Sequence, residues 1–180
     1  INKIVILDRD GVINEDLWGY VTRPEDFKAI KGSIESIARL SKKGVKIAIA
    51  TNQACINKKI ITSKELNQIH KYMIAMIEKL GGSVDFIAYC PHSPEENCKC
   101  RKPETGLLKK ISLEMNHNLK CSYFIGDKES DIKAAIAFGC TPLLVKTGYG
   151  MKTLDSDICP PKEHCFKNLE KATDYIIKML

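Results

Sequence analysis

Long apolar runs are absent from this sequence of 180 residues. No segment reaches the roughly 18 apolar residues that a helix needs to cross a bilayer, and no secretory signal pattern opens the chain. We therefore expect a protein that has no membrane partner. The sequence also lacks an initiator methionine, which suggests that the natural N-terminus has been trimmed.

Aromatic residues are scarce, at 7% of the chain, and no patch interleaves them with basic residues. Lys and Arg number 28 against 22 Asp and Glu, which gives a net charge of +6. This balance favours small phosphorylated molecules as ligands, and without an aromatic and basic patch we do not expect nucleic acid as a partner. Internal repeats, low-complexity segments and linkers are missing too, so we expect one domain over residues 1–180, and a monomer.

The eight cysteines lack the regular spacing of a disulfide framework. Three of them lie close together near one histidine, and the remaining five are scattered: Cys55, Cys121, Cys140, Cys159 and Cys165. An odd number of scattered thiols indicates a reducing compartment, so we predict a cytoplasmic location.

Short apolar strands alternate with helical patterns along the whole chain. We predict strands over 4–7, 45–50, 85–89, 122–125, 143–145 and 165–166. We predict helices over 33–43, 63–80, 104–115, 131–138 and 168–179. This alternation is typical of an α/β fold, a Rossmann-like three-layer α/β/α domain with a mainly parallel sheet and helices on both faces.

One predicted helix shows a clear apolar stripe. Ile69, Met73, Met76, Ile77 and Leu80 fall on one face, which we interpret as a core surface. Three histidines, His70, His117 and His164, have no partner in the sequence, and we assign them no role.

Two carboxylates directly follow the first strand, in the run Asp8-Arg9-Asp10-Gly11. Open α/β sheets place their sites at the carboxyl ends of parallel strands, and Gly11 allows a sharp turn there. One aspartate could act as a nucleophile and the other as a proton shuttle, with a divalent cation offsetting their repulsion. The alternative is an ordinary strand-to-loop turn in which an aspartate caps a helix.

A second cluster combines three thiols and an imidazole, in Cys90-Pro91-His92 and Cys98-Lys99-Cys100. Three Cys and one His form a usual tetrahedral Zn²⁺ site, and this loop has few apolar residues of its own. We therefore predict a structural zinc site held by Cys90, His92, Cys98 and Cys100. Chance clustering or a redox pair remain as alternatives, although Cys98 and Cys100 are too close in sequence for an easy mutual disulfide.

Three further polar motifs follow the aspartate pair. Thr51-Asn52-Gln53 follows the second strand, Arg101-Lys102-Pro103 precedes a helix, and an acidic run from Gly126 to Asp131 follows a later strand. The order of two Asp, then Thr, then Lys, then an acidic cluster resembles the haloacid dehalogenase-like phosphatases over roughly residues 4 to 150. No long insertion follows the first or second motif, so we expect no separate cap domain and an open site.

The resemblance implies a role for each motif residue. Asp8 would be the nucleophile, Asp10 the general acid and base, Thr51 a phosphate ligand, and Lys102 a charge partner of the transition state. It implies Mg²⁺ bound by Asp8, Asp127 and the backbone carbonyl of Asp10. It also implies a set of substrate-binding residues: Asp16, Gly19, Tyr20, Asn52, Gln53, Ala54, Arg101 and Lys128. We expect Asp131 to support the metal ligand or to begin a helix.

Two groups within that family share the zinc loop running into Arg101-Lys102-Pro103. They are the D-glycero-D-manno-heptose 1,7-bisphosphate phosphatases and the histidinol-phosphate phosphatases. Asn14, the run Gly19-Tyr20-Val21, Phe27 and Gly32 resemble the heptose group. This implies hydrolysis of the 7-phosphate of a phosphorylated sugar, in precursor synthesis for lipopolysaccharide or surface glycans.

The sequence departs from the heptose pattern at two places. Ala54-Cys55 replaces a typical Ser-Gly, and Leu17-Trp18 lengthens the substrate loop by one residue. Two alternatives therefore stay open. One is a phosphatase of the same mechanism acting on histidinol phosphate or another small phosphomonoester, and the other is a zinc-stabilised binding protein with an inactive site.

Overall fold

A six-stranded parallel sheet forms the centre of the computed structural model, which describes residues 3–180. The strands lie in the order β3-β2-β1-β4-β5-β6. Their bounds are Ile4–Leu7 (β1), Lys46–Asn52 (β2), Phe86–Cys90 (β3), Tyr123–Gly126 (β4), Thr141–Val145 (β5) and Cys165–Phe166 (β6). The six predicted strands are all present, and the predicted mainly parallel sheet is confirmed.

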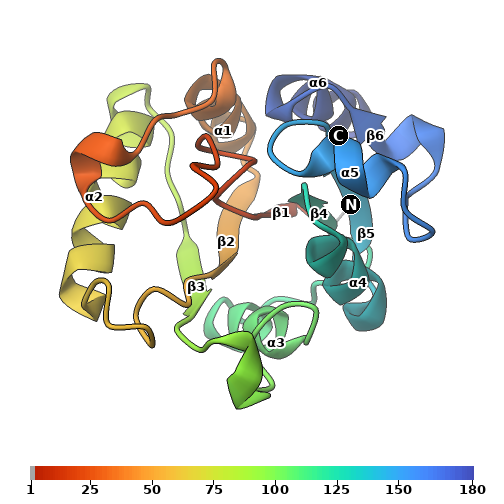
Figure 1. Cartoon of the computed structure of the whole chain (residues 1–180). Helices are drawn as coiled ribbons and strands as arrows, with labels where there is room; N and C mark the ends of the chain where they lie inside the picture. The colour runs from red at the N-terminus through yellow and green to blue at the C-terminus, as the bar shows by residue number, and fades with distance from the viewer. Residues whose placement is uncertain (1–2) are drawn as a thin grey trace.

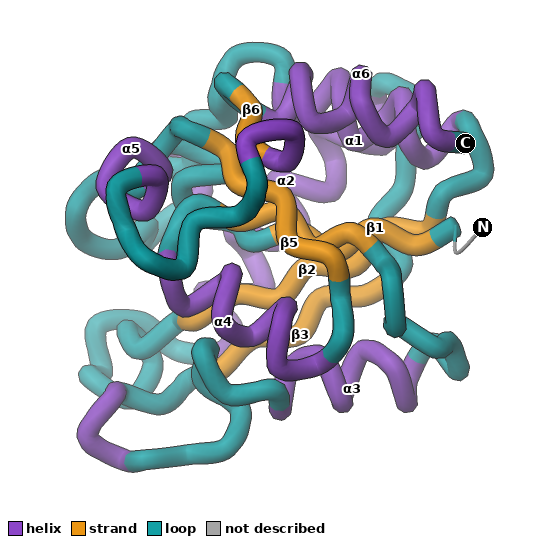
Figure 2. Tube along the Cα trace, turned by 90° about the vertical axis from the view of Figure 1, so that its right-hand side faces the viewer, coloured by secondary structure: helices purple, strands orange, loops and turns teal. Residues whose placement is uncertain are grey.

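Helices cover both faces of this sheet, as Figures 1 and 2 show. Helices α1, α2 and α6 lie on one face, and α3 and α4 lie on the other. Their bounds are Ser33–Lys42 (α1), Ser63–Lys79 (α2), Gly106–Glu114 (α3), Glu129–Phe138 (α4) and Leu169–Met179 (α6). The three-layer α/β/α architecture is therefore confirmed.

Strand β1 belongs to both apolar cores. Val5 and Leu7 point into the core beneath α1, α2 and α6, whereas Ile4 and Ile6 point into the core beneath α3 and α4. Successive side chains of a strand point to opposite faces, so an unbroken apolar run is what a doubly covered strand requires.

The structure adds short elements that the sequence analysis did not predict. They are α5 (Gly150–Leu154) and three single 3₁₀ turns, η1 (Pro24–Asp26), η2 (Pro94–Glu96) and η3 (Lys162–His164). Between β1 and α1 the chain holds only loop and η1, which agrees with the expected lack of a cap domain there. Within residues 3–180, no helix is both long enough and apolar enough to cross a membrane.

The prediction for the apolar stripe of α2 was wrong at its last residue. Ile69, Met73 and Ile77 are buried, but Leu80 is 39% exposed. The helix ends at Lys79, and Leu80 follows as the capping residue, so it no longer continues the buried face.

The sheet also determines where a site can form. The chain order changes direction at β1, which pairs with β2 on one side and with β4 on the other. Ligands of open α/β sheets bind at such a switch point, beyond the carboxyl ends of the strands. The motifs after β1, β2 and β4 therefore converge on one edge of the sheet.

Candidate active site

Lys102 lies at the centre of this edge and contacts residues from three strands or the segments that follow them, β1, β2 and β4. Its Nζ donates hydrogen bonds to Asp8 Oδ1 at 2.9 Å, Asp131 Oδ1 at 2.6 Å and the Ala50 carbonyl at 2.7 Å. An ammonium group has three donors, so this buried lysine is fully satisfied. Burial alone would lower the pKa of Lys102, but the carboxylates of Asp131 and Asp8 raise it, which keeps the amine charged.

Three buried carboxylates gather beside this lysine. Oxygen atoms of Asp8, Asp127 and Asp131 all lie within 4.8 Å of one another. Burial and the neighbouring Asp131 raise the pKa of Asp8 to about 6, and burial with Asp8 and Asp131 raises the pKa of Asp127 well above its usual range. A site that crowds negative charge in this way is suited to a cation.

Asp127 fits a metal ligand best. Its Oδ2 accepts the backbone N–H of Tyr149 at 2.8 Å, whereas its Oδ1 is buried with no hydrogen-bond partner among the described residues. Gly11 (φ +86°) and Gly148 (φ +55°) press against this carboxylate, and a Cβ on either would overlap Asp127 Oδ2. The two glycines thus form a cradle for Asp127, and the prediction that Gly11 allows a turn is confirmed.

Asp131 sits behind Asp127 at the start of α4. Its Oδ2 accepts the backbone N–H groups of Asp127 and Lys128, each at 3.1 Å. The expectation that Asp131 begins a helix is confirmed, although α4 starts at Glu129 and so places Asp131 in its first turn.

Asp10 has a different environment from Asp8. Its Oδ1 accepts hydrogen bonds from Arg9 (Nε, 3.1 Å; Nη2, 2.8 Å) and from Asn14 at 2.8 Å, and its Oδ2 accepts from Gln53 at 3.0 Å. Burial acts to raise the pKa of Asp10, but the Arg9 guanidinium and these donors hold it below the usual range. The two aspartates of one motif are therefore held by separate sets of partners.

Arg9 and His70 form a buried support behind Asp10 that the sequence analysis missed. Arg9 is completely buried, and its Nη1 lies 3.1 Å from His70 Nε2. Because a guanidinium only donates, the imidazole nitrogen accepts and the ring is neutral. Burial and the Arg9 charge lower the pKa of His70 to about 3. The position of Arg9 between the two aspartates was a signal, but nothing in the sequence near His70 pointed to this contact.

The end of β2 supports the site in two ways. Asn52 brackets the backbone of Lys102, because its Oδ1 accepts the Lys102 N–H at 3.0 Å and its Nδ2 donates to the Lys102 carbonyl at 3.1 Å. Gln53 is buried and donates to both Asp10 Oδ2 and Thr51 Oγ1, the latter at 2.9 Å. Thr51 and Gln53 therefore lie beneath the surface of the site.

A cavity of about 400 Å³ opens above these residues. Nine of its lining residues belong to the predicted site: Asp10, Asp16, Gly19, Tyr20, Asn52, Ala54, Arg101, Lys102 and Lys128. Three others were not predicted: Trp18, Ser130 and Tyr149. The cationic side chains of Arg101, Lys102 and Lys128 make this cavity suitable for an anion.

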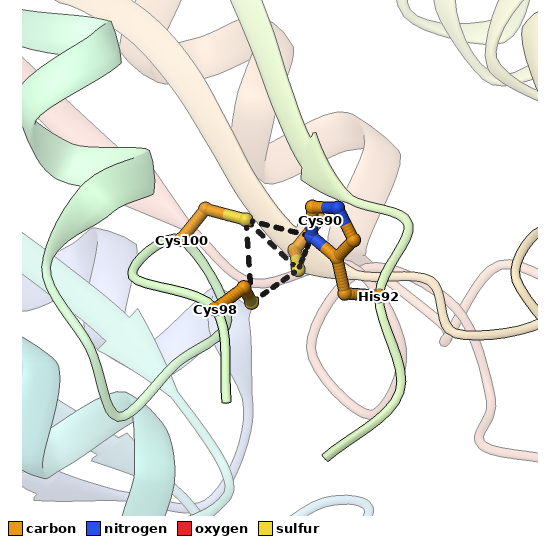
Figure 3. A group of neighbouring side chains, drawn as sticks. All are labelled: Cys90, His92, Cys98 and Cys100. Atoms are coloured by element: carbon orange, nitrogen blue, oxygen red, sulfur yellow. Dashed lines mark hydrogen bonds between the residues drawn. The ribbon is translucent and has the colours of Figure 1, made fainter. Parts of the chain in front are cut away.

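The four predicted zinc ligands come together in the structure, as Figure 3 shows. Distances from Cys100 Sγ are 3.1 Å to Cys90 Sγ, 3.5 Å to Cys98 Sγ and 3.2 Å to His92 Nδ1. Cys90 Sγ lies 3.6 Å from Cys98 Sγ and 3.5 Å from His92 Nδ1. Sulfur ligands about 2.3 Å from a tetrahedral Zn²⁺ lie about 3.8 Å apart. The three sulfur atoms lie somewhat closer together than this, and the set of three thiols and one imidazole suits zinc.

The zinc loop is connected directly to Arg101. Cys98 Sγ accepts the Arg101 backbone N–H at 3.3 Å, and Arg101 Nη1 donates to the His92 carbonyl at 3.2 Å. Both the backbone and the guanidinium of Arg101 are thus held by residues of the loop, and the loop presents Arg101 to the cavity.

Comparison with known proteins identifies phosphatases that are similar to this chain. Residues 3–158 match the model of the polynucleotide kinase 3 phosphatase family. A curated relative, the D-glycero-beta-D-manno-heptose-1,7-bisphosphate 7-phosphatase of Pseudomonas putida, is 43% identical over 156 residues, which cover 87% of this chain and 89% of the relative.

Two solved structures are also similar. The D,D-heptose 1,7-bisphosphate phosphatase of Bordetella bronchiseptica, complexed with magnesium and phosphate, superposes with a TM-score of 0.94 at 35% identity, over 98% of this chain and 99% of that chain. The corresponding phosphatase of Burkholderia thailandensis gives a TM-score of 0.73 at 30% identity, over 97% of each chain. The chain therefore belongs to the family of haloacid dehalogenase-like phosphatases that includes the heptose-bisphosphate phosphatases.

Proposed function

We propose that this chain hydrolyses the 7-phosphate of D-glycero-D-manno-heptose 1,7-bisphosphate through an aspartyl-phosphate on Asp8. One arrangement carries the proposal. Asp8 pairs with Lys102 beside the buried carboxylates of Asp127 and Asp131. Asp10, which Arg9 holds, lines the cationic cavity next to them. The similarity of this chain to heptose-bisphosphate phosphatases, one of them at 43% identity, supports the choice of substrate.

Asp8 is the proposed nucleophile. Its Oδ1 accepts hydrogen bonds from Lys102 Nζ and from the Arg9 backbone N–H at 2.8 Å, which hold the carboxylate in one orientation. The carboxylate attacks phosphorus, and the bond from phosphorus to the sugar oxygen breaks. Lys102 offsets the negative charge that develops on the phosphoryl group.

Asp10 is the proposed acid and base. It lines the cavity, so in its protonated form it can give a proton to the departing sugar oxygen. As a carboxylate it then takes a proton from the water that hydrolyses the aspartyl-phosphate. Its four hydrogen bonds fix the carboxyl group, and they favour the ionised form that acts in this second step.

The residues present fit Mg²⁺, which prefers oxygen ligands. Asp8, Asp127 and the backbone carbonyl of Asp10 would hold it, and the unpaired Oδ1 of Asp127 supports this assignment. When bound, Mg²⁺ would offset the charge of the nucleophile and the phosphoryl oxygens. Zn²⁺ at Cys90, His92, Cys98 and Cys100 would instead be structural, because protein atoms fill all four positions.

Arg101 is the proposed ligand of the second phosphate. A guanidinium presents paired donors that match phosphate oxygens, and the zinc loop keeps Arg101 at the cavity wall. Lys128 and Asp16 form an ion pair in the lining of the same cavity, with 3.4 Å between Nζ and Oδ2, and supply a cation and an acceptor for the sugar hydroxyls.

Cellular context follows from the same proposal. We propose that residues 1–180 form one domain, and that the enzyme is cytoplasmic and monomeric and acts on a small sugar phosphate, with no nucleic acid or membrane partner. Its product would enter lipopolysaccharide or surface-glycan precursor synthesis.

A substrate comparison tests the function. Phosphate release with Mg²⁺ is measured for both anomers of the heptose bisphosphate and for histidinol phosphate. We expect the highest kcat/KM for one anomer of the heptose bisphosphate. A higher value for histidinol phosphate would reject the proposed substrate while leaving the phosphatase mechanism intact, and release from no phosphomonoester would indicate an inactive binding protein.

A further inference from the structure

Trp18 is the one tryptophan of the sequence and stands at the rim of the cavity. This residue is 69% exposed, which is unusual for so large an apolar side chain. Its backbone has φ +57°, in the left-handed region that bulky residues rarely adopt. Asp16 Oδ1 accepts the Trp18 backbone N–H at 2.9 Å and so stabilises this turn.

The ring of Tyr149, far along the sequence from Trp18, contacts the Trp18 ring. The two ring centroids lie 4.5 Å apart, and the ring planes make an angle of 73°, which is a favourable edge-to-face arrangement. Both rings line the cavity. We call these two side chains the aromatic wall.

The aromatic wall is anchored to the catalytic end of the cavity. The Tyr149 backbone N–H donates to Asp127 Oδ2, and Lys128 Nζ lies 4.8 Å from the centre of the Tyr149 ring. Lys128 in turn pairs with Asp16, whose other oxygen holds the Trp18 backbone. Trp18 is therefore exposed at a defined position relative to the proposed metal ligand.

The chemistry of the cavity suggests what this wall contacts. The other lining side chains are mostly charged or polar, so they match phosphates and hydroxyls. A sugar ring also has faces made of C–H groups. Packing such a face against an aromatic ring is favourable, because it removes apolar surface of both from water. An acyclic phosphomonoester offers little such surface.

We propose that Trp18 and Tyr149 bind the C–H face of the sugar ring of the substrate, and that this contact makes the enzyme favour cyclic sugar phosphates over acyclic ones. This inference rests on the proposed function and assigns two further residues to substrate specificity.

Tryptophan fluorescence tests the contact directly, because the emission comes from Trp18 alone. Asp8→Asn protein, which should bind without turnover, is titrated with D-glycero-D-manno-heptose 1,7-bisphosphate at constant Mg²⁺. We expect the emission to be quenched or to shift to shorter wavelength with saturation. Inorganic phosphate at the same Mg²⁺ should leave the emission unchanged, since it does not reach the wall.

Kinetics test specificity. The ratio of kcat/KM for the heptose bisphosphate to kcat/KM for acetyl phosphate should fall about tenfold in Trp18→Ala, mostly through KM for the sugar, which corresponds to the loss of one good aromatic contact. Trp18→Phe keeps a ring and should recover most of the ratio. Leu17→Ala, at a neighbouring exposed residue that does not line the cavity, should keep the wild-type ratio.

The outcomes separate the two proposals. If the wild type hydrolyses the heptose bisphosphate but the emission does not respond and Trp18→Ala keeps the ratio, the aromatic wall is not a sugar site and the proposed function stands. If the wild type releases no phosphate from the heptose bisphosphate, the proposed substrate fails, and this assignment fails with it.

Discussion

Two aspartates separated by a single residue differ because their side chains have different partners. Asp8 shares a buried space with Asp127 and Asp131 and is neutralised by Lys102, whereas Asp10 is bound by Arg9, Asn14 and Gln53. The pKa values move in opposite directions, upward for Asp8 and downward for Asp10. Pairs of carboxyl groups whose environments differ in this way are suited to different roles in one reaction.

Removing either carboxylate should separate these roles. We expect Asp8→Asn to abolish turnover, since an amide cannot form the aspartyl-phosphate, and Asp10→Asn to lose ~10²–10⁴-fold of kcat. Both proteins should keep the wild-type circular dichroism spectrum. Steady-state phosphate release measures the effect, and near-normal activity of folded Asp8→Asn would rule out the mechanism.

His70 should make folding sensitive to acid. Its pKa is lowered from 6.5 to about 3, so in this window the unfolded chain carries a proton that the folded chain lacks. Stability therefore falls as the pH falls below 6.5, by at most about 1.4 kcal/mol per pH unit, or about 2 kcal/mol at pH 5. His70→Gln should lose this pH dependence of stability, and its side-chain oxygen should still accept a hydrogen bond from Arg9.

Urea unfolding at pH 7, 6 and 5 measures this effect as the difference between variant and wild type, which cancels the acid sensitivity of the zinc site. His164→Gln, near the opposite edge of the sheet, is the matched control and should follow the wild type. An identical pH dependence in His70→Gln and wild type would mean that His70 is not held neutral by burial.

At the scale of elements, the zinc loop connects β3 to α3 and presents two basic residues to the site. Cys90 ends β3, and the loop then passes through Cys98 and Cys100 to Arg101 and Lys102. Its own apolar content is low, so Zn²⁺ bound by its thiols and imidazole would supply the cross-link that a core otherwise provides. Hydrogen bonds from Arg101 to Cys98 Sγ and to the His92 carbonyl tie the position of Arg101 to this loop.

Zinc removal should act on this element first. We expect one tightly held Zn²⁺ per chain after dialysis against a weak chelator, with little Mg²⁺ retained. Cys98→Ser and Cys100→Ser should each lose zinc, lower the melting temperature and weaken activity. Cys121→Ser, at an exposed thiol outside the loop, should keep a full equivalent. Retention of all zinc in both loop variants would show that the ligand assignment is incorrect.

At the scale of the whole molecule, the sheet places the proposed catalytic groups at one edge. The end of β2 supplies Thr51, the residues that directly follow β1 and β4 supply Asp8 and Asp127, and the segment before α3 supplies Lys102. Gathering three buried carboxylates there has a cost in folding free energy, because like charges repel and lose water. A cation that binds only the folded chain should offset this cost.

Mg²⁺ should therefore stabilise the folded protein. At a concentration about 100 times its dissociation constant, the expected gain is about 2.7 kcal/mol, seen as a higher melting temperature. Asp127→Asn should show little response to Mg²⁺ and should be at least as stable as the wild type without it, because a repulsive carboxylate is gone. Asp174→Asn, on the exposed face of α6, should respond like the wild type. An unchanged response in Asp127→Asn would remove this residue from the metal site.

The sequence by itself determined the alternation of strands and helices, the pair Asp8 and Asp10 and the zinc ligands. These features are local: apolar periodicity follows from the geometry of each element, and the four zinc ligands lie within the eleven residues from Cys90 to Cys100. Their neighbours in space are largely their neighbours in the chain, so residue type and spacing carried the information.

Only the tertiary structure decided the contacts between distant segments. Arg9 meets His70 across 61 positions, Lys102 meets Asn52 across 50, and Trp18 meets Tyr149 from opposite ends of the sequence. No local pattern marks such pairs, because they arise from the order of strands in the sheet and the crossover helices between them. The exposure of Leu80 was also visible only in the structure. The apolar stripe predicts a face of α2 but not the residue at which that helix leaves the core.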